Sequence, residues 1–269
     1  MSTALMTSAP PAARPVRLRP ALRLLAHQVR YEQLSFWRNP QSAVFTFIFP
    51  VVFITIIGAL FGGKTTSAYF GGRSALGYYV PTIAALSVLG SCYGQLAVAL
   101  AARRQNGILK RARATPLPAW AYFGGLLAHC VLVSVVDIVL IVGVSRLYGL
   151  ALPSNWTAIL LTLVLAAACF CALGVAVASV ISNAEAAPAV AQLVLFPLLF
   201  LSGTYGPISS HLLASVTGWL PVRPFNQALA ASFGPHGGIG WGHLGVLLAW
   251  GAVGALVAIR RFRWNPRPE

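Results

Sequence analysis

Six long apolar segments constrain this chain most, because each is long enough to cross a lipid bilayer as a helix. A bilayer core needs about 20 apolar residues per helix. The segments cover residues 42–61, 78–101, 120–144, 158–181, 186–205 and 244–259. Only 9% of the 269 residues are charged and 58% are hydrophobic, whereas a typical soluble domain has about 25% charged residues. We therefore predict an all-α polytopic membrane protein with six transmembrane helices, which excludes an ordinary soluble enzyme.

The basic residues are divided unevenly between the two sides of the predicted spans. The chain has 19 Lys and Arg residues against 4 Asp and Glu, a net charge of +15. Fifteen of the 19 lie on the side of the two termini: six before the first span, five between the second and third, and four after the sixth. Because basic residues concentrate on the cytoplasmic side of membrane proteins, we predict that both termini are cytoplasmic. This distribution accounts for the charge without a nucleic-acid partner.

In the first 40 residues no apolar core precedes a small-residue cleavage site, so we expect no cleavable signal peptide there. Residues 1–16 are predicted to be a disordered cytoplasmic tail, and residues 17–269 a single transmembrane domain. Between residues 18 and 37, apolar side chains fall near one helical face and arginines alternate with them. This pattern predicts an amphipathic helix in the inner-leaflet interface that leads into the first span. A soluble helix packed on a partner is the alternative.

Two connections between spans are informative. The loop of residues 102–118 reads ARRQNGILKRARATPLP, and its residues 106–114 can form two helical turns with Ile108, Leu109 and Ala112 on one face. Thr115 ends this helix because a residue before proline is disfavoured in the α region. Such a helix could transmit the movement of a cytoplasmic partner into both spans; the alternative is a loop that only sets orientation. The second connection, residues 182–185, is short and predicts a tight helical hairpin between the fourth and fifth spans.

The 102–118 loop resembles that of type-2 ABC exporter permeases, where a basic, Gly-containing stretch ending in Thr-Pro-Leu-Pro follows the second span. Other similar pieces occur in the same order: Asn39-Pro40 with Phe49-Pro50, LFPLLFLSGTYGP at residues 195–207, and WLPVRPFNQAL at residues 219–229. The C-terminal RRFRWNPR is similar to the tails of actinobacterial members. The resemblance covers nearly the whole chain. It departs at Gln105, where members commonly carry Glu, so that this position can form a hydrogen bond but no salt bridge.

The resemblance implies the permease subunit of an ATP-driven exporter of drugs, antibiotics or other amphipathic compounds, located in the bacterial cell membrane. Two permease subunits, identical or different, would pair with two cytoplasmic ABC ATPase subunits that bind ATP and Mg. Residues 105–118 would be the coupling helix, residues 18–37 a connecting helix at the membrane surface, and residues 206–233 an outer re-entrant hairpin. The implied coupling residues are Gln105, Gly107, Leu109, Lys110, Arg111, Arg113 and Pro116.

The substrate path would lie where two permeases meet, lined by the first, second and fifth spans. Its candidate residues are Pro50, Tyr93, Gln95, Asp137, Gln192 and Pro197. The prolines each free a backbone carbonyl and can bend their helices. Gly90 and Gly94 in the second span permit close helix approach, either within the chain or at the interface.

Asp137 is the only acid inside a predicted span. An intramembrane carboxylate costs about 2.5–3.5 kcal/mol on insertion scales. It marks either a proton or cation site, or a hydrogen bond to a neighbouring helix. The alternative function is therefore an ion-coupled secondary transporter that uses Asp137. A single intramembrane charge and the lack of a clear internal repeat in the sequence argue against it.

Other motifs do not predict a catalytic site. GALFGGKT at residues 58–65 satisfies a phosphate-loop pattern, but it ends a predicted span on the outer side instead of joining a strand to a helix. Cys169 and Cys171 would lie about 200° apart on a helix, so we predict that these cysteines, with Cys92 and Cys130, pack as small buried residues without a metal. Four acids provide too few groups for a catalytic constellation. An integral membrane enzyme is therefore disfavoured, and no cofactor is expected on this chain.

Overall fold

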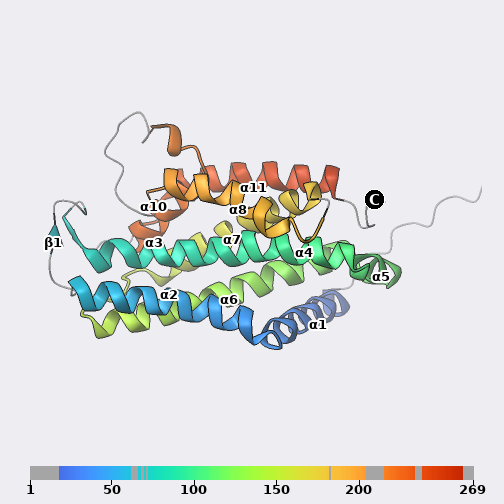
Figure 1. The fold of residues 1–269 in the computed structure, drawn as a ribbon, viewed down its shortest axis with the longest axis horizontal. Helices are drawn as coiled ribbons and strands as arrows, with labels where there is room; N and C mark the ends of the chain where they lie inside the picture. Colours follow the sequence, from blue (N-terminus) through green and yellow to red (C-terminus); the bar gives the residue numbers. More distant parts are fainter. Residues whose placement is uncertain are drawn as a thin grey trace, which may run out of the picture.

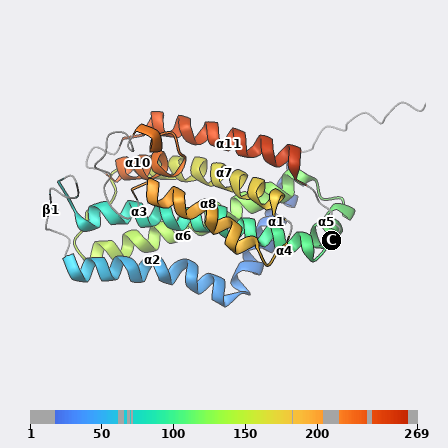
Figure 2. The same cartoon turned by 45° about the horizontal axis from the view of Figure 1, so that its top comes forward.

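A computed structural model describes residues 18–61, 66–67, 70, 72–181, 183–203, 215–233 and 238–262. Its long helices run side by side along the longest axis of the molecule (Figures 1 and 2). The helices are α1 (Leu18–Trp37), α2 (Pro40–Phe61), α3 (Ala75–Leu89), the π-helix η2 (Gly90–Gln95), α4 (Leu96–Gln105), α5 (Ile108–Ala114), α6 (Ala119–Leu147), α7 (Trp156–Val180), α8 (Ala187–Leu201), α10 (Val222–Ser232) and α11 (Trp241–Arg261). Strands β1 (Thr66–Ser67) and β2 (Arg73–Ser74) pair antiparallel before α3.

Five helices in the described part of the chain are long and apolar enough to cross a membrane: Pro40–Phe61, Ala75–Gln105, Ala119–Leu147, Trp156–Val180 and Trp241–Arg261. They confirm helices at predicted spans one, two, three, four and six. The fifth predicted span corresponds to α8, which has 15 residues. At 1.5 Å per residue it extends about 22 Å, less than a bilayer core of about 30 Å. The predicted span continues to residue 205, outside the described residues, so six spans remain a prediction.

The core of the bundle lies around α7, which packs against η2 and against helices α4, α6, α10 and α11. Of the most apolar stretch of α7, 61% is buried, against 22% for α2 and 17% for α11. Phe170 on α7 and Phe225 on α10 are both fully buried, with ring centroids 5.5 Å apart. The apolar outer faces of α2 and α11 suit lipid chains or another membrane helix, because neither surrounding requires polar side chains.

The amphipathic helix and the loop helix predicted on the cytoplasmic side, α1 and α5, lie at one end of the bundle (Figure 1). Helix α1 has the bounds expected from its amphipathic pattern and packs against α6 and α2. Helix α5 follows Gly107, whose φ of 69° lies in the left-handed region that glycine adopts without strain. It ends at Ala114, and Thr115 is extended with ψ of 158°. The helix stop predicted from Pro116 is therefore confirmed.

The prediction of a tight hairpin between α7 and α8 is wrong. Within the described residues, α8 packs mainly on α4, η2 and α10 instead of along α7. Hydrogen bonds from the end of α4 explain the path of α8. Arg104 donates to the carbonyls of Ala178 and Ile181, and Gln105 accepts from the amide of Ala184. The connection is therefore held against α4, and α8 leaves it along that helix.

Several predicted features fall partly or wholly outside the described residues. These are the 1–16 tail, residues 263–269, residues 204–205 at the end of the predicted fifth span, and residues 206–214 at the start of the predicted re-entrant segment. The later part of that segment forms α10, which packs on α11, α3 and α7. The phosphate-loop pattern begins at Gly58 inside α2, where a Cβ would come within 2.5 Å of the Tyr148 ring. That glycine therefore serves helix packing, and residues 62–65 of the pattern are not described.

Candidate functional site

A π-helix in the second span forms one wall of the candidate site. Such segments are rare and concentrate at functional sites. Opposite η2 on α7, a Cβ on Gly174 would lie 3.0 Å from the carbonyl oxygen of Tyr93 and 3.2 Å from that of Cys92. Glycine at this position therefore lets the two backbones touch. A Cβ added at Gly90 or Gly94, by contrast, would meet no atom within 4 Å, so among the described residues neither glycine is needed for close helix packing and the interface alternative stays open.

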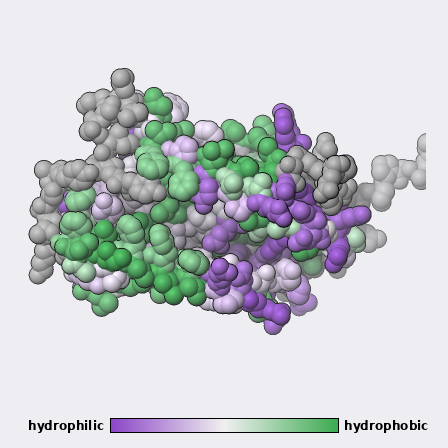
Figure 3. Space-filling model, in the orientation of Figure 1, coloured by the Kyte–Doolittle hydropathy of each residue, from purple (hydrophilic) through white to green (hydrophobic). Residues whose placement is uncertain are grey.

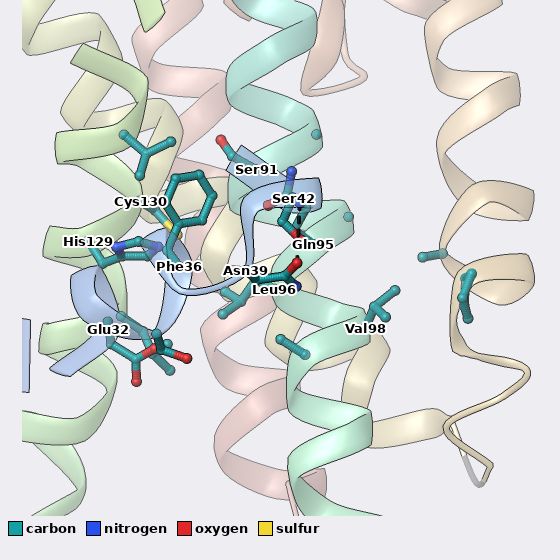
Figure 4. Close-up of a pocket in the computed structure, with 18 of the residues that line it drawn as sticks. Glu32, Phe36, Asn39, Ser42, Ser91, Gln95, Leu96, Val98, His129 and Cys130 are labelled. Atoms are coloured by element: carbon teal, nitrogen blue, oxygen red, sulfur yellow. Dashed lines mark hydrogen bonds between the residues drawn. The ribbon is translucent and has the colours of Figure 1, made fainter. Parts of the chain in front are cut away.

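A cavity of about 610 Å³ adjoins η2, with walls from α1, α2, α4, α6 and α8 (Figure 4). A smaller cavity of about 260 Å³ shares part of this lining and reaches α2. Five residues line both cavities: Gly90, Ser91, Gln95, Gln192 and Leu195. We call the two adjoining cavities the η2 groove. Its polar lining includes Ser35, Asn39, Ser42, Ser91, Gln95, His129 and Gln192.

The structure brings three of the predicted path residues together. Pro50, Gln95 and Gln192 line the η2 groove. The Gln95 side-chain amide donates a 2.8 Å hydrogen bond to the Thr46 hydroxyl, which ties η2 to α2. Tyr93 does not belong to the groove lining that the structure describes; its hydroxyl donates to the carbonyl of Ala191 on α8 at 3.3 Å.

The two other path candidates, Pro197 and Asp137, also fall outside the described lining. Pro197 is exposed on α8. Asp137 is 1% exposed and accepts a hydrogen bond from the Ser87 hydroxyl on α3, while its Oδ1 has no hydrogen-bond partner among the described residues. Ser87 lines the smaller cavity, so Asp137 lies one hydrogen bond behind the groove wall. This is the interhelical bond that the sequence offered as the alternative to an ion site.

An ion pair that sequence reasoning missed joins α1 to α4 beside the groove. Arg103 donates to both carboxylate oxygens of Glu32, at 2.8 and 2.6 Å. Gln28 donates to the same carboxylate at 2.9 Å, and Arg103 also donates to the Tyr122 hydroxyl of α6 at 3.2 Å. Glu32 is 2% exposed, so its charge requires these partners. The available signal was that Glu32 is one of only 4 acids in the chain.

The next two residues along the chain also bond inward. Arg104 is 4% exposed and donates to the carbonyls of Ala178, at 2.9 Å, and Ile181. A helix leaves its last carbonyls without intrahelical partners, and a cation there is favoured by the helix dipole. Gln105, predicted to contact the ATPase, accepts a 2.7 Å hydrogen bond from the amide of Ala184. Its side-chain oxygen is thus engaged within the chain.

Helix α5 separates an anchoring side chain from an exposed basic face. Leu109 is 0% exposed and packs into the main core, so it holds α5 to the bundle and is not available to a partner. Lys110, Arg111 and Arg113, with Pro116 after the helix, lie on the outside. We call the three cations the α5 basic face. Figure 3 shows hydrophilic residues gathered over the end of the molecule that carries α5 in Figure 1.

Long apolar helices around an open groove, with a short basic helix at one end, are the architecture of a multi-pass membrane protein. The family described as ABC-2 type transporter matches residues 24–233, which include most of α1 and all of the η2 groove, α5 and α10. The chain belongs to this family of membrane permeases, whose members typically pair with an ABC ATPase and are not themselves catalytic. A search of curated proteins found no match.

Proposed function

We propose that this chain is the membrane subunit of an ATP-driven exporter that moves drugs, antibiotics or other amphipathic compounds out of a bacterial cell. The observation that carries the proposal is the η2 groove. Its larger cavity of about 610 Å³ falls in the range of about 300–1,000 Å³ typical of small-molecule sites. Amide side chains of Gln95 and Gln192 face the same space as Phe45, Phe49 and Phe196. An amphipathic compound could therefore form hydrogen bonds with the amides and apolar contacts with the aromatic rings in the same groove.

A second permease would complete the groove. Exposed apolar side chains flank it on α2 and α8: Phe45, Ile48, Phe49 and Val52 on the first, and Leu193, Val194, Phe196 and Phe200 on the second. Some of these residues also line the smaller cavity, so the apolar face and the groove are continuous. A second copy or a related permease seated on this face would close the substrate path between the two subunits.

The α5 basic face is the proposed contact with the ATPase, which would carry ATP and Mg. Helices α4, η2 and α3 form one uninterrupted span, Ala75–Gln105. Movement of α5 would therefore reach the groove wall through α4. The Glu32–Arg103 pair offers a second route, through α1 to α2. The gathering of basic side chains at this end supports a cytoplasmic location for both termini.

The test is transport in proteoliposomes that contain the permease and the ABC ATPase with which it co-purifies. ATP should drive uptake of an amphipathic dye into inside-out vesicles. Replacing both groove amides, Gln95→Leu with Gln192→Leu, should reduce dye transport at least about tenfold, because an unpaired polar substrate group costs about 1–3 kcal/mol. The variant should keep its ATPase binding. Transport by this variant at the wild-type rate would show that the η2 groove is not part of the substrate path.

A single variant separates this function from the ion-coupled alternative. Asp137→Asn keeps an acceptor for the Ser87 hydroxyl and should leave ATP-driven transport within about twofold of the wild type, since Asp137 does not belong to the described groove lining. The alternative requires that this variant abolish transport. Dye movement driven by a proton gradient, without any ATPase, would overturn the proposed function.

A further inference from the structure

Three cysteines from three separate segments meet inside the bundle. Cys92 on η2, Cys130 on α6 and Cys171 on α7 have sulfur atoms that all lie within 4.8 Å of one another. They are 0%, 4% and 7% exposed. Cys169, the fourth cysteine, is not a member of the group. Cys169 and Cys171 do point apart on α7, but the cluster forms between helices, so their separation does not prevent it.

We propose that Cys92, Cys130 and Cys171 form a three-coordinate binding site for copper(I), a soft monovalent metal ion. Thiolates favour copper(I), zinc and iron–sulfur clusters. A trigonal ion with metal–sulfur bonds of about 2.3 Å holds its sulfurs about 4 Å apart, so the observed cluster needs only a small contraction. A structural zinc site takes four ligands. The Ser134 and Ser91 hydroxyls lie 3.8 and 3.9 Å from the Cys92 sulfur, too far to be a fourth ligand without movement.

The backbone around the cluster explains why the thiols converge. Gly174 and Cys171 are three residues apart on α7 and share a helical face. That face meets η2, where the missing Cβ of Gly174 lets α7 touch the carbonyls of Cys92 and Tyr93. On α6, Cys130 and Ser134 share a face in the same way, and Ser134 contacts Cys92. The π-helix is thus clamped between the two helices that supply the other sulfurs.

Copper(I) binding at the cluster is coupled to proton release, because metal-bound cysteine is a thiolate. Binding of one ion forms three metal–sulfur bonds, breaks three S–H bonds and releases three protons, with no change in oxidation state. The protons can leave through the η2 groove, which Cys130 lines. The occupied site carries a charge of −2, and the Ser91 hydroxyl, which donates to the Cys92 sulfur at 3.9 Å, is a polar group that lowers the cost of burying it.

The cluster has a route for an ion on each side. Cys130 lines the η2 groove near Phe36 and His129 (Figure 4). Cys171 lines a separate apolar cavity of about 560 Å³ between α6, α7 and α11. A metal site needs an entry path as well as ligands, and the groove supplies the more polar one.

The test is copper(I) binding by the full chain, purified in detergent without a polyhistidine tag and kept reduced under nitrogen. Titration against a copper(I)-specific chelator should show one ion per chain. Cys92→Ser, Cys130→Ser and Cys171→Ser should each weaken binding by more than about 100-fold, beyond the 10–100-fold typical of outer-shell changes. Cys169→Ser is the matched control, since it removes a buried thiol from the same helix, and it should bind as the wild type does.

A measurement on the wild type does not depend on the folding of variants. The X-ray absorption spectrum of the copper-loaded protein should show three sulfur neighbours at about 2.3 Å and no nitrogen or oxygen. Failure to retain copper, a first shell with nitrogen or oxygen, or equal loss in Cys169→Ser would overturn the site and leave the thiols as packing residues. Neither measurement uses an ATPase or transport, so this inference fails or stands independently of the proposed exporter.

Discussion

The loop after the second span divides its basic residues into two groups with opposite surroundings. Arg103 and Arg104 bond inward, to the carboxylate of Glu32 and to the carbonyls at the end of α7. Lys110, Arg111 and Arg113 lie on the outer side of α5. All five count equally toward membrane orientation, yet only the second group can meet a partner. The comparison shows that a charge cluster in a permease loop can combine internal anchors with an exposed basic face, which is the surface that we propose for the ATPase.

Arg104→Ala should produce the largest loss of stability. It removes charged hydrogen bonds from the buried carbonyls of Ala178 and Ile181, and each such bond contributes about 1.5–3 kcal/mol. We expect the free energy of unfolding in detergent to fall by about 3 kcal/mol, measured by denaturant titration. Arg113→Ala, which changes an exposed arginine on α5, is the control. Equal stability of the two variants would contradict the division into inner and outer groups.

Glu32→Gln should have the next largest effect. It leaves the Arg103 guanidinium, whose side chain is 18% exposed, without its anionic partner. Because the Arg103 side chain keeps some contact with solvent although Glu32 is buried, the loss should be about 1–2 kcal/mol, below the value of about 3–5 kcal/mol for breaking a fully buried pair. A double-mutant cycle with Arg103→Gln measures the coupling between α1 and α4. Additive losses in that cycle would show that the two side chains do not act together.

Gln105→Ala should have a smaller effect, about 0.5–1 kcal/mol, because it removes one exposed hydrogen bond from the Ala184 amide. The matched variant is Gln105→Glu, which introduces the residue that the resemblance implies at this position and can still accept that bond. Its stability should equal that of the wild type. If Gln105→Glu leaves stability unchanged but alters the affinity for the ATPase, a carboxylate at this position contacts the partner. Gln105 would then belong with the exposed residues of α5 and not with the inward-bonded Arg103 and Arg104.

The features predicted from sequence are those that neighbouring residues determine. Periodic apolar side chains indicated the bounds of α1, and Thr115 before Pro116 indicated the end of α5. The contact between η2 and α7 and the thiol cluster were not predictable, because they bring together residues far apart in the sequence, such as Gly174 and the carbonyls of Cys92 and Tyr93 about 80 residues before it. The prediction of a hairpin between α7 and α8 failed for the same reason: the side chain that redirects α8, Arg104, lies in another helix.

Reversing the charge of the outer group should have the smallest effect on stability and a large effect on the partner. The double variant Arg111→Glu with Arg113→Glu should change the free energy of unfolding by less than about 0.5 kcal/mol, as expected for exposed side chains. Binding of the ABC ATPase, measured by co-purification at several salt concentrations, should weaken strongly, and the binding that remains should no longer weaken with salt. The control is Arg260→Glu with Arg261→Glu, which makes the same charge change in the exposed last turn of α11. If both double variants lose the ATPase equally, the partner responds to the overall charge of this end and α5 is not its specific contact.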